Sequence, residues 1–180
     1  MGREIEWKGL VQTTGTFETV SSEIMALVGL SLSKLESGNY ISAYWKTPHG
    51  NAKYIRMNVG SYVDLVVKVN DKGSTDDRAE YTVVLDDKYK DEMSELLTAA
   101  LGDPIPLMFR FTEWFVGRDL CISIVQNLEQ PQHLFVEVEG PTQHEVDFWV
   151  AKLNTLQETG FVKVKNSMYD IFVLRQGILF

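Results

Sequence analysis

Two short stretches of the chain carry glutamates at alternating positions. Glu4 and Glu6 lie in EIEWK, and Glu137 and Glu139 lie in FVEVE. Side chains on a β-strand alternate between its two faces, so each pair would share one face. Like charges on one face repel unless a cation or a base lies between them. Carboxylate oxygens are the ligands that Mg²⁺ and Mn²⁺ prefer, so metal binding is a candidate chemistry.

Basic residues recur in the same alternating pattern. Lys8 would share a strand face with Glu4 and Glu6, and Arg56 would share one with Asn58. Further bases stand in other predicted strands: Lys68, Arg78 beside Glu80, and Arg110. Taken singly, each strand is typical of an antiparallel sheet with one face in water. Taken together, the charges are also explained by one lumen in which Arg and Lys contact phosphate oxygens.

Turn residues divide the chain into elements that could position these charges. Strands are predicted at 3–11, 40–46, 53–59, 62–70, 78–86, 106–116, 118–126 and 133–140. Helices are predicted at 21–36, 89–101 and 143–158, with a short element at 167–175. Because most strand connections are short, the sheet should be mainly antiparallel. The pattern indicates an α+β fold with helices outside a curved or closed sheet, and residues 1–180 fit a single domain.

Composition excludes several classes of function. The net charge of −8 argues against a protein that coats duplex DNA. No apolar run is long enough to span a membrane. The single cysteine, Cys121, cannot form an internal disulfide, which favours a cytoplasmic location, and its apolar surroundings predict a buried, unreactive thiol. The three histidines are scattered, so no zinc site is indicated.

The ordered series of motifs resembles the CYTH superfamily, the triphosphate tunnel metalloenzymes. Glu4-Ile5-Glu6-Trp7-Lys8 matches its ExExK signature, and Phe135-Val136-Glu137-Val138-Glu139 is similar to its F-x-E-x-E strand. Between them, Arg56, Lys68, Arg78-Ala79-Glu80 and Arg110 resemble its basic strands, and Lys165-Asn166-Ser167-Met168-Tyr169 resembles its closing segment. The resemblance extends over nearly the whole chain. It implies an eight-stranded antiparallel β-barrel closed into a tunnel, with helices packed outside.

The resemblance also implies a function and a set of site residues. Members of the family hydrolyse triphosphates or cyclise ATP, so we expect a divalent-metal phosphohydrolase that acts on a triphosphate or nucleotide ligand. The implied metal ligands for Mg²⁺ or Mn²⁺ are Glu4, Glu6, Glu137 and Glu139. The implied phosphate contacts are Lys8, Arg56, Lys68, Arg78, Arg110 and Lys165, with Lys163 as a weaker candidate. Glu80 and Lys68 are the implied catalytic residues, Glu80 through metal binding or water orientation.

The chain departs from the family pattern at four places. Asn58, Met108 and Thr82 stand where the family has charged residues, and CISIVQN lacks an expected aspartate. Each loss removes a charge-assisted contact that typically contributes about 1.5–3 kcal/mol. Two alternatives to hydrolysis therefore stay open. The first is a protein that binds or sequesters a nucleotide or polyphosphate without turnover, and the second is an interaction module that uses Trp45, Trp114 and Trp149.

Overall fold

The computed structural model describes most of the chain. The described residues are 5–12, 15–47, 52–69, 80–156, 160–165, 167–175 and 177–178, with the backbone alone at 52, 53, 68, 69 and 80. The strands are β1 Ile5–Val11, β2 Leu32–Lys46, β3 Ala52–Val59, β4 Val63–Val69, β5 Glu80–Leu85, β6 Ile105–Val116, β7 Leu120–Asn127, β8 Leu134–Gly140 and β9 Phe161–Lys163. The α-helices are α1 Phe17–Val28, α2 Lys90–Leu101 and α3 Gln143–Leu153. Short helical turns cover Gly29–Ser31, Asp87–Tyr89 and Tyr169–Val173.

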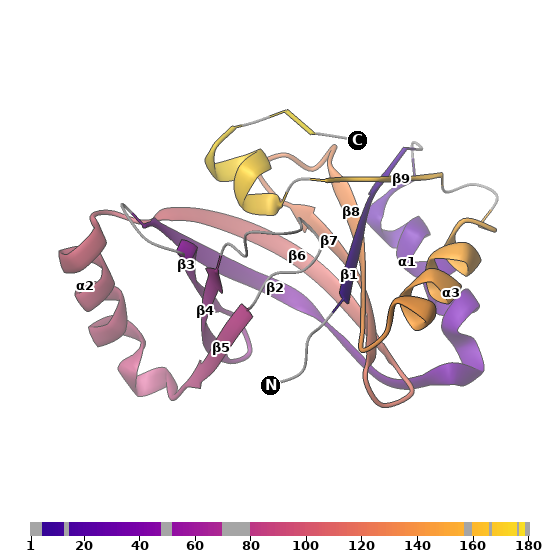
Figure 1. The fold of residues 1–180 in the computed structure, drawn as a ribbon, viewed down its shortest axis with the longest axis horizontal. Coiled ribbons are helices and arrows are strands. Elements are labelled where there is room, and N and C mark those ends of the chain that lie inside the picture. The colour runs from indigo at the N-terminus through magenta and orange to yellow at the C-terminus, as the bar shows by residue number, and fades with distance from the viewer. Residues whose placement is uncertain are drawn as a thin grey trace.

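The strands form one curved antiparallel sheet (Figure 1). Its nine strands run in the order β5-β4-β3-β2-β6-β7-β8-β1-β9. Within the described residues no pairing joins the outer strands β5 and β9. The prediction of a closed eight-stranded barrel is therefore wrong, although the antiparallel pairing and the α+β class are confirmed. A barrel closes only when its two edge strands pair in register, and no short stretch of sequence indicates such pairing.

The first helix differs most from its predicted position. α1 begins at Phe17, before the predicted start at residue 21, and Thr16 caps it, because the Thr16 hydroxyl accepts a hydrogen bond from the Thr19 N–H. The helix ends at Gly29, whose positive φ of 32° suits a residue without a side chain. Residues 32–36, predicted as helix, form the start of the long strand β2, which pairs with β6 along most of its length. The long-range pairing overrides the local helical pattern.

Two helical groups cover the outer face of the sheet. α1 and α3 pack on β6, β7, β8 and β1, which places Ile5 and Trp7 against the main hydrophobic core. α2 packs on β2, and its Leu97 joins a smaller core around Trp45. Trp45, Trp114 and Trp149 are at most 7% exposed, so these three residues contribute to cores and do not form the exposed interface considered from the sequence. No helix within the described ranges is long and apolar enough to cross a membrane.

The C-terminal segment crosses one end of the sheet (Figure 1, yellow). Its helical turn Tyr169–Val173 is buried throughout. Tyr169 stacks on Tyr54 with ring centroids 4.5 Å apart, and Phe172 meets the edges of Phe109 and Phe135 at 6.1 and 6.0 Å. This aromatic cluster fills one end of the inner face of the sheet.

A candidate ligand-binding lumen

The strand registers place one row of polar side chains across the inner face of the sheet. Lys8 of β1 is opposite Glu137 of β8, which is opposite Ser123 of β7. Ser123 is in turn opposite Glu113 of β6, and Glu113 is opposite Glu36 of β2. Side chains that are directly opposite in a sheet point to the same face, so the row joins five strands on one side. The sequence alternates polar and apolar residues along each strand. Strand pairing then brings the polar side chains of neighbouring strands together.

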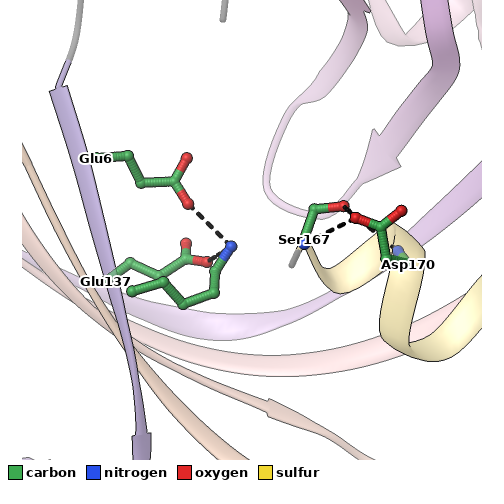
Figure 2. A network of polar contacts seen from close by, with 5 residues as sticks. Glu6, Glu137, Ser167 and Asp170 are labelled. Atoms are coloured by element: carbon green, nitrogen blue, oxygen red, sulfur yellow. Dashed lines mark hydrogen bonds and ion pairs between the residues drawn. The ribbon is translucent and has the colours of Figure 1, made fainter. Parts of the chain in front are cut away.

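Lys8 lies at the centre of an ion triad in this row. Figure 2 shows the two carboxylates of the triad, Glu6 and Glu137, pointing toward one another. Its ammonium Nζ lies 2.9 Å from Glu6 Oε1 and 2.8 Å from Glu137 Oε1. The side chain is 9% exposed. Burial alone would lower the pKa of Lys8, but the Glu137 and Glu6 carboxylates outweigh it and hold the pKa well above its ordinary value. Lys8 is therefore a permanent cation whose ammonium has three donors, of which the two carboxylates take two.

Two adjoining cavities lie over this inner face. The smaller, about 90 Å³, is lined near the C-terminal segment by Lys8, Glu6, Ser167 and Met168 among others. The larger, about 220 Å³, extends toward the turn between β3 and β4 at Gly60–Tyr62. Five residues line both cavities, which makes them compartments of one lumen: Tyr40, Arg56, Val125, Glu137 and Glu139. Ser167 beside the smaller cavity is fixed by Asp170, whose Oδ2 accepts from the Ser167 hydroxyl at 2.8 Å (Figure 2).

The structure therefore brings together five of the residues that the sequence pointed to, namely Glu6, Lys8, Arg56, Glu137 and Glu139. Glu4 and Arg78 lie outside the described residues. Lys68 and Glu80 are opposite one another in the β4–β5 pairing, and their side chains are outside the description. Lys165 is exposed and lines neither cavity, and Lys163 lies in the edge strand β9, opposite Gly9.

Arg110 lies on the outer face of β6, which corrects its expected role as a phosphate contact. Its guanidinium donates to Glu18 Oε1 of α1 at 2.5 Å and lies 4.2 Å from the centroid of the Phe17 ring. The inner face of β6 instead presents Phe109, Phe111 and Glu113 to the cavities. On this strand the lumen thus has two aromatic rings and an acid, and the one base that the resemblance implied, Arg110, points away from it.

Glu113 is the main lumen residue that the sequence reasoning missed. It is half-buried and lines the larger cavity. Burial, followed by the charges of Glu36 and Glu137, raises the pKa of Glu113 to about 7. The spacing of Glu113 from Phe109 and Phe111 could have identified it, because residues two apart on a strand share a face.

Cys121 lines the larger cavity and is half-buried, so it is less buried than predicted. Burial and the nearby Glu113 carboxylate raise the pKa of its thiol above the ordinary range. The thiolate is the reactive form of cysteine, so the predicted low reactivity agrees with this environment.

The donor chemistry of Glu6, Glu137 and Glu139 suits Mg²⁺ or Mn²⁺, but the arrangement does not make a metal site. Within the described ranges no three His, Cys, Asp or Glu side chains are grouped so that they could hold a metal ion. Two of the three carboxylates contact the Lys8 ammonium instead. The described residues therefore do not fit a bound divalent metal in this conformation.

Comparison with solved structures places the fold. A putative adenylyl cyclase from Hippeastrum, whose structure is described as revealing a dominant triphosphatase activity, superimposes with a TM-score of 0.68, at 11% identity over 97% of both chains. A putative adenylate cyclase from Bacillus halodurans gives 0.61, at 16% identity over 96% of this chain and 100% of the other. A chain of the Schizosaccharomyces pombe Mediator head module gives 0.57, at 14% identity over 89% and 99%.

These likenesses show that the chain shares the fold of these solved structures. No protein-family model and no curated protein sequence matches the chain. At these identities the comparisons establish the architecture, and function has to be argued from the lumen itself.

Proposed function

We propose that this protein binds a triphosphate-containing ligand in its lumen and hydrolyses a phosphoanhydride bond. The observation that carries the proposal is the meeting of Lys8 and Arg56 with Glu6, Glu137 and Glu139 around one cavity. A guanidinium and an ammonium are the groups that contact phosphate oxygens, the first in bidentate fashion. The activity named for the Hippeastrum protein of the same fold supports this choice of ligand.

The lumen residues would act by holding charge and position. Lys8 keeps one donor available for a phosphate oxygen while Glu6 and Glu137 fix its ammonium. Arg56, in the wall shared by both compartments, would align the next phosphate. Phosphoryl transfer depends mainly on such alignment and on stabilising charge at the transferred group. A carboxylate of the same wall, Glu137 or Glu139, would orient the attacking water.

The test is phosphate release from tripolyphosphate, ATP, thiamine triphosphate and RNA with a 5′-triphosphate. Arg56→Gln should reduce kcat/KM at least tenfold, because it removes a contact to the reacting phosphates. Arg110→Gln is the matched control, since Arg110 lies on the outer face, and it should leave kcat/KM within about twofold of the native value. Equal losses in the two variants would contradict the site, and absence of release from all four substrates would contradict hydrolysis.

Dependence on Mg²⁺ or Mn²⁺ stays a prediction, tested by repeating the assay with each ion and with a chelator. No step above depends on a metal, because the described carboxylates do not form a metal site. Stimulation by either ion that the chelator reverses would support metal dependence, and equal activity with the chelator would contradict it.

A second candidate function, binding without turnover, is favoured by a specific observation. The inner face of β6 presents Phe109, Phe111 and Glu113 where a catalytic lumen of this family would present bases. Calorimetric binding of tripolyphosphate with no phosphate release would select this function. The Mediator head module chain shows that the fold also occurs in a large assembly.

A further inference from the structure

The larger cavity is lined mainly by negatively charged groups, which do not suit a polyanion. Its lining carries one guanidinium, Arg56, and four carboxylates, which are Asp64, Glu113, Glu137 and Glu139. Glu137 is engaged by Lys8. The compartment therefore has an excess of negative charge, and an anion placed at its outer end would be repelled.

Burial and the neighbouring acids Glu36, Glu137 and Asp64 raise the pKa of Glu113, while the Lys34 ammonium lowers it. A carboxyl group keeps its proton near neutral pH where its negative charge is unfavourable. A cation bound beside Glu113 would offset that charge.

Aromatic rings share this lining with the acids. Tyr40 and Phe111 meet edge to face with centroids 5.4 Å apart, and Tyr62, 55% exposed, stands at the turn that borders the cavity. Aromatic faces attract cations through their quadrupole, most effectively when the cation is an organic ammonium with little bound water.

A polar group inside the cavity is also left without a partner. Ser123 is 8% exposed and lines the larger cavity, and its hydroxyl makes no hydrogen bond within the described residues. The hydroxyl can therefore donate to or accept from a polar group bound in the cavity.

We propose that the larger cavity binds an organic ammonium ion, held by the Asp64 and Glu113 carboxylates, the Ser123 hydroxyl and the rings of Tyr40, Tyr62 and Phe111. An inorganic divalent ion is the less suitable occupant. Such an ion needs several oxygen ligands at short range, and no grouping of that kind exists among the described side chains. An ammonium needs only nearby negative charge, acceptors and aromatic faces.

The inference goes beyond the proposed triphosphate site, and its test contains no phosphate, so the two can fail separately. Calorimetric titrations at constant ionic strength would use choline and spermidine as probes, with MgCl₂ as the inorganic comparison. The wild type should bind both organic cations. Glu113→Gln should weaken binding at least tenfold, and Phe111→Leu about three- to tenfold.

The matched control is Glu95→Gln, which removes the same charge from an exposed position in α2 and should change the affinity by less than twofold. Circular dichroism at the same pH would confirm that each variant is folded. Equal affinities of the Glu113 and Glu95 variants would overturn the proposal. So would absence of organic-cation binding, or Mg²⁺ binding that displaces choline.

Discussion

At the scale of single residues, the lumen is organised by one buried cation. Lys8 is shared by two carboxylates from different strands, Glu6 on β1 and Glu137 on β8. The triad compensates the desolvation of Lys8 and fixes the like-charged glutamates at positions where they would otherwise repel. Lys8 thus lies between one carboxylate from each of the two acidic strands.

Replacing Lys8 with Met should destabilise the protein by about 3 kcal/mol, because both carboxylates lose their partner in a poorly solvated site. Urea unfolding at pH 7 measures the change. Lys34→Met is the control: Lys34 is 61% exposed and its ion pair with Glu36 lies near the surface, so the loss should stay near about 0.5 kcal/mol. A Lys8 variant as stable as the Lys34 variant would show that the triad contributes no net stability.

Glu113 gives the protein a defined pH response. Its pKa is about 7 in the folded protein and has an ordinary value of 4.5 in the unfolded chain. The folded protein therefore binds more protons between these values, and the free energy of unfolding falls as pH rises from 4.5 to 7. Above pH 7 the buried carboxylate is ionised, which lowers the free energy of unfolding by roughly 3 kcal/mol.

Glu113→Gln should remove the loss of stability that ionisation of Glu113 causes above pH 7. The variant should be more stable than the wild type at pH 8 and nearly equal to it at pH 5, as measured by urea unfolding at both pH values. Glu95→Gln controls for net charge. A difference between wild type and Glu113→Gln that does not change with pH would contradict the raised pKa.

At the scale of elements, the C-terminal segment closes one end of the lumen. Phe172 is 6% exposed and contacts the rings of Phe109 and Phe135. Met168, at the start of the same segment, lines the smaller cavity. The segment therefore contributes to the core and to the wall of the site together.

Phe172→Ala should cost about 3–4 kcal/mol, because it leaves a cavity between rings that cannot fully collapse. Thermal and urea unfolding measure the loss. Leu174→Ala, two residues further on and 39% exposed, should cost less than about 1 kcal/mol. If the two changes cost the same, the segment is not anchored through Phe172.

At the scale of the whole molecule, the sheet is curved around the lumen with its outer strands apart. Among the described residues β5 pairs with β4 alone, whereas β8 pairs with both β7 and β1 and lies under the main core. Exposed side chains Tyr81, Val83 and Val84 show how little of β5 is covered. Local stability should therefore fall from the centre of the sheet to this edge.

Amide hydrogen exchange should show this gradient. We expect the amides of β5 to exchange at least 100-fold faster than those of β8, because β5 opens without disturbing the core. Mass spectrometry of peptides from the two strands gives the comparison. Equal protection would mean that β5 is paired with something in solution.

The amino-acid sequence by itself determined the alternation within strands, most turns, the antiparallel pairing and the charged pairs at Glu6, Lys8, Glu137 and Glu139. These features are local, because a period of two and a turn residue act over a few positions. Only the tertiary structure decided which face of each strand points inward. Arg110 and Glu113 are three residues apart and so lie on opposite faces of β6, and either could have faced the lumen.

The register with β7 and the packing of α1 settled that choice, placing Glu113 inside and pairing Arg110 with Glu18. The conversion of residues 32–36 from a predicted helix to strand has the same origin, since it depends on pairing with β6 some 80 positions away. Closure of the sheet is also nonlocal. It depends on the summed twist and curvature of all strands, which no short stretch of sequence specifies.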